Sequence, residues 1–194
     1  MKKMLNLLMV LLLVVSMVLP VLAEETDSVR QNGAPTVAEV EDDTMEVVVT
    51  PLIDMDKASW EVKQEMEAAA EALNEGDLTK VQGVQEAVQA LNEMNAAEAA
   101  GEETPAEIKV EDLVVSEVFH VDASKPGVAI TFQAEGIKAG QFLMVMVFVD
   151  GQWVVLDADA VEILEDGKVR IVFENYGTVA FVVDKNEAAA AAEA

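Results

Sequence analysis

The sequence predicts an α+β protein, in which an N-terminal helical hairpin precedes a C-terminal antiparallel β-sandwich of about seven strands. Two Asp-Gly pairs, Asp150-Gly151 and Asp166-Gly167, each stand between apolar runs. Asp-Gly is among the strongest short-range signals for a β-hairpin, because both turn positions favour positive φ. Short runs of β-branched and aromatic residues recur between residues 113 and 184 at a spacing of roughly eight to twelve residues. These observations indicate an Ig-like sandwich domain over residues 108–184.

Two of the expected strands differ in how many of their faces are apolar. The strand over 142–149 is apolar on both faces, one made by Phe142, Met144, Met146 and Phe148 and the other by Leu143, Val145, Val147 and Val149. The strand over 168–174 is apolar on one face only, since Val169, Ile171 and Phe173 alternate with Lys168, Arg170 and Glu174. We therefore expect the sheet to be covered unevenly, with the helices or a partner chain over the second face of the first strand.

Residues 45–96 predict a strand followed by the helical hairpin. A β-branched run over 45–53 ends near Pro51, and a helix capped by Asp56 or Ser59 continues to about Asn74. A second helix is expected from Asp77, with Gly83 as a weak point inside it. The apolar stripes of the two helices, together with Trp60, are interpreted as core; they are Val62, Met66, Ala69, Ala70 and Leu73 in the first helix, and Leu78, Val81, Val84, Val88, Leu91 and Met94 in the second.

The remaining segments are interpreted as export and spacer sequences. Residues 1–23 carry two lysines, an apolar run and a small residue before two acids, which predicts a secretory signal peptide cleaved after Ala23. The alternative is an uncleaved membrane anchor, because the apolar run is almost long enough to span a bilayer. A disordered acidic spacer over 24–44, a linker over 97–107 and a disordered tail over 185–194 are also expected.

Composition narrows the classes of partner. The chain has 12 Lys and Arg against 37 Asp and Glu, and its formal net charge of −25 disfavours nucleic acid and anionic membrane surfaces as partners. Cysteine is absent, which excludes disulfides, thiolate metal sites and a cysteine nucleophile. A cysteine-free chain with a signal peptide fits a secreted, extracellular protein, associated with a bacterial cell surface and stabilised by packing alone.

Few residues suggest a site. His120, the one histidine, is expected to be a half-exposed strand residue, and no nucleophile or phosphate-loop motif accompanies it. Asp157 and Asp159 lie two apart and would share a face of an extended chain, so they could help to hold Ca²⁺, although the EF-hand pattern fails at Val161. Trp153 and Tyr176 are candidate ligand-binding aromatics, with core packing as the alternative for Trp153. No catalytic residue and no cofactor beyond Ca²⁺ is predicted.

The order of these pieces resembles a known group of proteins. The segments VVVTPLIDMD, DLVVSEVFHVD, GIKAGQFLMVMVFVDGQWVVL and DGKVRIVFENYGTVAFVVD, spread over Val47 to Asp184, are similar to those of secreted and wall-attached proteins of Gram-positive gut bacteria, especially clostridia. The chain departs from the group at Gly177-Thr178, where Ser-Pro is typical. The resemblance implies an extracellular address and a β-sandwich, and it brings no catalytic residues.

We therefore expect a secreted, non-catalytic structural or interaction module at the bacterial cell surface. The first alternative is an adhesin-like module that binds carbohydrate or protein through Trp153 and Tyr176 or through an open strand edge. The second alternative is a hydrolase that uses paired carboxylates.

Overall fold

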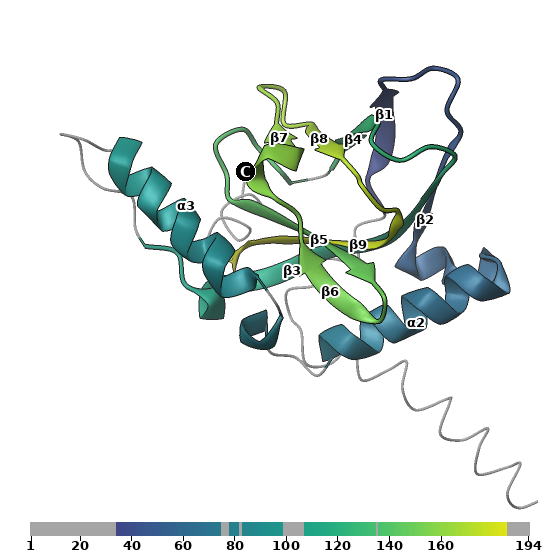
Figure 1. The fold of residues 1–194 in the computed structure, drawn as a ribbon, viewed down its shortest axis with the longest axis horizontal. Coiled ribbons are helices and arrows are strands. Elements are labelled where there is room, and N and C mark those ends of the chain that lie inside the picture. Colours follow the sequence, from purple (N-terminus) through teal and green to yellow (C-terminus); the bar gives the residue numbers. More distant parts are fainter. Residues whose placement is uncertain (1–33, 75–77, 82, 99–106, 135, 186–194) are drawn as a thin grey trace, which may run out of the picture.

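The computed structural model describes residues 34–74, 78–81, 83–98, 107–134 and 136–185. It is an α+β fold in which two antiparallel sheets face each other and two helices pack against the larger sheet, α2 (Trp60–Asn74) below it and α3 (Val84–Glu98) at the left in Figure 1. The four-stranded sheet has the order β1 (Thr36–Val40), β4 (Ala129–Gln133), β8 (Val169–Val172) and β7 (Val161–Ile163). The five-stranded sheet has the order β2 (Val47–Pro51), β3 (Leu113–Ala123), β9 (Gly177–Asp184), β5 (Leu143–Val149) and β6 (Gln152–Val155). The α+β class and the antiparallel sandwich are thus confirmed.

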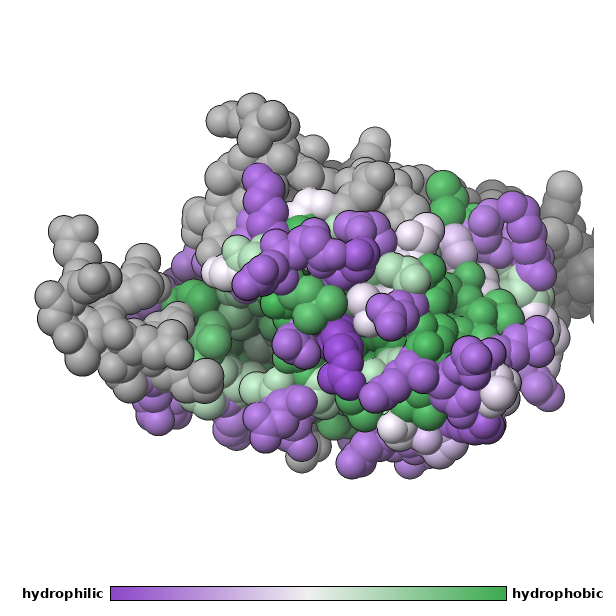
Figure 2. All heavy atoms as spheres, turned by 90° about the horizontal axis from the view of Figure 1, so that it is seen from above, coloured by the Kyte–Doolittle hydropathy of each residue, from purple (hydrophilic) through white to green (hydrophobic). Residues whose placement is uncertain are grey.

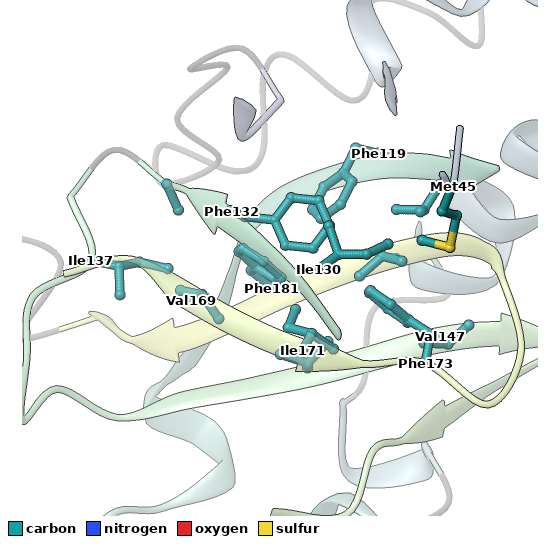
Figure 3. Close-up of a cluster of buried hydrophobic side chains, with 14 residues drawn as sticks. Met45, Phe119, Ile130, Phe132, Ile137, Val147, Val169, Ile171, Phe173 and Phe181 are labelled. Carbon is teal, nitrogen blue, oxygen red and sulfur yellow. The ribbon is translucent and has the colours of Figure 1, made fainter. Parts of the chain in front are cut away.

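A cluster of phenylalanines fills the space between the two sheets. Phe119 and Phe181 come from the five-stranded sheet, Phe132 comes from the four-stranded sheet, and all three are fully buried. The ring of Phe119 lies 5.7 Å from that of Phe132 and 5.1 Å from that of Phe181, in the tilted and edge-on arrangements that aromatic pairs prefer. Figure 3 shows these rings meeting between the sheets, flanked by aliphatic side chains. This cluster supplies the stability that a chain without disulfides requires.

The second face of the five-stranded sheet is covered by the helices. Met144, Met146 and Phe148 of β5 pack with residues of α2 and α3, whereas Val145 and Val147 point into the space between the sheets. The predicted two-faced burial of this strand is therefore confirmed. The helices cover different parts of the sheet in Figure 1, and the helical hairpin is not confirmed.

The segment before the helices belongs to the sandwich. We predicted a disordered spacer over 24–44, but residues 36–40 form β1, which pairs antiparallel with β4. This prediction is wrong for β1, because a strand with an irregular register at the sheet edge needs little hydrophobic periodicity. β2, expected as a short strand, pairs with β3, so strands that precede and follow the helices lie in one sheet. The predicted signal peptide and most of the predicted linker and tail cannot be compared with the structure, because residues 1–33, 99–106 and 186–194 lie outside the described residues.

Glycines set two boundaries of these elements. The second helix begins at Val84, not at Asp77, because Gly83 has a φ of +88° and separates it from a short 3-10 helix, η3 (Leu78–Lys80). Asp150 and Gly151 both have positive φ, as expected for the turn between β5 and β6. In the second Asp-Gly pair only Gly167 has positive φ, and a Cβ there would lie 2.8 Å from a backbone carbonyl oxygen. The second turn is therefore of another type, although it joins the predicted hairpin.

Among the described helices, α2 and α3 both pack on the five-stranded sheet, and neither covers the outer face of the four-stranded sheet. Arg170 of β8 lies 3.4 Å from Glu41 and 4.0 Å from Glu162, so its guanidinium links carboxylates across this face. Figure 2, which views the molecule from the side of this sheet, shows hydrophobic surface exposed between groups of hydrophilic residues. The sandwich is covered unevenly, as the sequence predicts. Within the described ranges, no helix combines the length and apolarity needed to cross a bilayer.

Candidate functional site

Trp153, a predicted ligand-binding residue, is part of the core. Its side chain is only 4% exposed, its ring lies 5.3 Å from that of Phe148, and its indole Nε1 donates a hydrogen bond to the carbonyl oxygen of Ala69 in α2 at 3.1 Å. The position follows from the strand pattern, since Trp153 pairs with Phe148 across the hairpin and both face the helices. A ring held in this way has no face free for stacking on a sugar, so the alternative of core packing holds for Trp153.

Tyr176 is half-buried at the corner between β8 and β9. Its ring lies 5.8 Å from that of Phe173, and its hydroxyl donates a hydrogen bond to the carbonyl oxygen of Lys125. Burial raises the pKa of the Tyr176 hydroxyl. These contacts tie the last strand to the turn between β3 and β4, so the residue has a structural part in closing the sandwich.

Asp157 and Asp159 do not form the arrangement expected of a cation site. We predicted a shared face of an extended chain, but Asp159 lies within a 3-10 helix, η5 (Ala158–Ala160), which Asp157 precedes, and both residues are exposed. No cluster of three or more Asp, Glu or His side chains with the spacing of a metal site occurs among the described residues. Ca²⁺ would need several further oxygen ligands at this pair.

The one histidine lies in a polar contact between α2 and the five-stranded sheet. His120 was expected to be half-exposed, but it is 7% exposed because Glu65 of α2 lies over it. The Nδ1 atom of His120 lies 3.4 Å from Glu65 Oε1 and 3.4 Å from the hydroxyl oxygen of Thr178. Glu65 Oε1 also accepts hydrogen bonds from the Thr178 backbone N–H at 2.7 Å and from its hydroxyl at 3.0 Å. Desolvation lowers the pKa of His120, against the opposing influence of Glu65 and Asp122.

The geometry of this cluster differs from that of a nucleophile relay. A relay needs the acid and the nucleophile on opposite ring nitrogens of the histidine, whereas Glu65 and Thr178 both contact Nδ1. Thr178 is fully buried. A Cβ at Gly177 would lie 2.9 Å from Glu65 Oε1, so the glycine allows the carboxylate to approach the strand. The cluster therefore positions α2 on the sheet.

Three exposed apolar residues lie close together in the sequence, where β2 leads into α2. Ile53 is 72% exposed, Trp60 is 74% exposed, and Val48 is 50% exposed. They belong to consecutive segments of chain: β2, the 3-10 helix η2 (Leu52–Lys57) and the first residue of α2. We call Ile53 and Trp60, with Val48 of the preceding strand β2, the apolar corner. The segment from β2 to α2 lies at the right of Figure 1. The other exposed large apolar side chains in the described part of the chain, Val37 and Val154, lie on other edge strands.

Local sequence explains the shape of the apolar corner. Pro51 ends β2, and Ser59 begins α2 by accepting a hydrogen bond from the Val62 N–H with its side-chain oxygen at 3.3 Å. The lysines of the segment are held by neighbouring acids: Lys57 lies 2.6 Å from Asp54, and Lys63 lies 2.8 Å from Asp56. The Lys63 ammonium lowers the pKa of the Asp56 carboxyl. Both lysines between β2 and the first turn of α2 are thus paired with neighbouring aspartates.

Trp60 was interpreted as core, and this interpretation is wrong. Successive helix residues are about 100° apart, which places Trp60 roughly 140° from the centre of the stripe formed by Val62, Met66, Ala69, Ala70 and Leu73. Of that stripe, Met66 and Ala69 are fully buried. The angular position of Trp60 was the signal in the sequence that could have identified it as exposed.

A search of protein-family models, curated proteins and solved structures finds no match for this chain.

Proposed function

We propose that this chain is a secreted, non-catalytic interaction module of the bacterial cell surface, which contacts its partner through the apolar corner. The observation that carries the proposal is the exposure of Trp60 and Ile53, the two most exposed large apolar residues in the described part of the chain. Aromatic side chains presented at a surface are typical anchors of protein interfaces. The amino-terminal sequence, with its basic, apolar and small-residue segments, supports export.

The strand order supports an Ig-like arrangement. From β4 to β9 the chain places one strand in the smaller sheet, two in the larger, two in the smaller and one in the larger. This is the order of strands B to F in an immunoglobulin sandwich, and β1 takes the place of strand A beside β4. β3, which precedes β4, occupies the place of strand G beside β9. Sandwiches of this kind commonly serve as cell-surface modules, and this likeness of fold is an analogy only.

Carbohydrate binding is the second candidate, and the exposed indole of Trp60 is the observation that favours it. A flat aromatic face open to solvent can stack on a sugar ring, and Trp153 cannot offer one. Protein binding is preferred because the same stretch of chain also exposes two aliphatic side chains, Ile53 and Val48, which offer apolar contact area rather than hydrogen bonds.

Export is tested by producing the full chain with its own amino-terminal segment in a Gram-positive host and fractionating the culture. The proposal predicts chain that begins at Glu24 in the medium or on the cell surface. Full-length chain that stays in the cytoplasm would refute the proposed address.

Binding is tested on arrays of surface proteins and glycans with two matched variants. The first variant changes Ile53→Ser and Trp60→Ser, and the second changes Val154→Ser, which is 44% exposed on the opposite edge of the same sheet. Both should give the circular dichroism spectrum of the parent, because they alter exposed residues. We expect the corner variant to lose the binding that the Val154 variant keeps. Equal binding by both variants would contradict a contact at the apolar corner. Whether the parent chain binds protein spots or glycan spots on the array distinguishes the two candidate functions.

A further inference from the structure

We propose that the partner of the apolar corner is a basic protein segment, which stacks a Lys or Arg side chain on Trp60 and lays an apolar side chain against Ile53. This inference rests on the proposed function and names the chemistry of the partner. Trp60 is the most exposed large apolar residue of the described chain, and its neighbours in sequence include exposed acids. Tryptophan is the best aromatic partner for a cation, with a gain of about 0.5–1 kcal/mol at an exposed site.

The charge of the surrounding segment favours a cation. Residues 46–67 contain six acids, Glu46, Asp54, Asp56, Glu61, Glu65 and Glu67, and two bases, Lys57 and Lys63, so their formal balance is 2 − 6 = −4. Both lysines are paired with aspartates of the same segment. Glu46, Glu61 and Glu67 are exposed and can face an incoming partner. An apolar anchor within an acidic segment is complementary to a peptide that alternates apolar and basic side chains.

The charge of the whole chain disfavours the acidic partners that could compete for the apolar corner. A second copy would bring another formal charge of −25 to the surface, and anionic polymers or lipid head groups would also be repelled. A basic segment is instead attracted over a Debye length of about 8 Å at physiological salt, which raises its rate of association. The same field predicts binding that weakens as salt is added.

The test measures binding of a labelled peptide to the purified chain by fluorescence anisotropy. The probe is a synthetic peptide of alternating lysine and leucine, and the comparison peptides replace lysine with glutamate or with serine. We expect the lysine peptide to bind, the glutamate peptide not to bind, and affinity for the lysine peptide to fall at least tenfold between 50 mM and 500 mM salt.

Three variants locate the contact. Trp60→Ala should weaken binding of the lysine peptide about fivefold or more, and Glu61→Gln should weaken it about twofold, because each removes one part of the proposed recognition. Val154→Ser, on the far edge of the sheet, should leave it unchanged. Equal binding by the Trp60→Ala variant would overturn the inference, since it would show attraction by net charge alone.

The comparison peptides separate this inference from the proposed function. If the serine peptide binds as well as the lysine peptide and depends on Trp60, the apolar corner is a contact surface but its partner is not basic. If neither peptide binds in a way that depends on Trp60, the inference fails, and the array experiment with the corner variant decides the proposed function by itself.

Discussion

The contact between Glu65 and Thr178 is predicted to fix α2 on the five-stranded sheet, and Glu65→Ala should therefore destabilise the fold. The substitution removes the acceptor of two hydrogen bonds, from the Thr178 N–H at 2.7 Å and from its hydroxyl at 3.0 Å. Thr178 is fully buried, so water reaches these donors only through the space that the glutamate leaves. The substitution destabilises the folded state only, because the N–H and the hydroxyl of Thr178 both hydrogen bond to water in the unfolded chain.

The magnitude follows from the burial of the two partners. Leaving a buried donor without an acceptor costs about 1–3 kcal/mol. The side chain of Glu65 is 36% exposed, which lets water follow into the vacated space, and the cost should lie near the lower end of that range, at about 1–2 kcal/mol for the whole contact. Glu65→Gln keeps an amide oxygen that can accept from Thr178 and should cost less than about 1 kcal/mol.

The assay is equilibrium unfolding in urea, followed by tryptophan fluorescence in a Trp60→Phe background. Trp153 then reports alone, and it touches α2 directly through its hydrogen bond to Ala69. Glu61→Ala is the control, because Glu61 is an exposed residue of the same helix and should change the free energy of unfolding by no more than about 0.5 kcal/mol. If Glu65→Ala were no more destabilising than Glu61→Ala, the contact would not hold the helix and the reasoning would be refuted.

Two further predictions concern a turn and the histidine. Gly167→Ala should destabilise the folded protein by more than the roughly 1 kcal/mol expected of Gly151→Ala. Both glycines have positive φ, but only at Gly167 would the new Cβ clash with backbone, 2.8 Å from a carbonyl oxygen. Thermal unfolding of both variants measures the two losses of stability, and equal losses would contradict this prediction. The lowered pKa of His120 means that the unfolded chain binds the proton more tightly. The contribution of the neutral His120 ring to the free energy of unfolding is therefore fully present above the pKa of histidine in the unfolded chain, about 6.5. It is lost as the pH falls below that value, towards and through the lower pKa of the folded protein. Urea titrations between pH 7.5 and 5.5 should show a steeper loss for the parent than for His120→Gln, and parallel losses in the two proteins would count against this account.

The sequence predicted the sheets better than their surroundings, for physical reasons. Alternation of apolar and polar residues located the strands from Leu113 to Asp184 because each buries one or two faces in a fixed core. β1 was missed because most of its side chains are exposed, so burial imposes little pattern on it. The pairing of β3 with β9 shifts register between Val115 and Glu117, an irregularity of the kind that a β-bulge produces.

The candidate site was harder to predict, since it depends on which elements meet. The contact of Glu65 with His120 joins residues 55 positions apart, and no local pattern marks it. Trp153 could not be separated from an exposed aromatic until the position of α2 over β6 was known. Trp60, by contrast, was open to prediction from helical geometry, because its angle from the apolar stripe already placed it outside the core.

The most direct test of the account is photocrosslinking from position 60. A photoreactive amino acid placed there, and separately at position 154 on the opposite edge of the sheet, is irradiated in the chain displayed by the producing cells. The account predicts covalent adducts to a discrete partner from position 60, suppressed by excess parent chain, and none of those adducts from position 154. The absence of adducts from position 60, or the same adducts from both positions, would contradict the claim that the apolar corner is the contact surface of this protein.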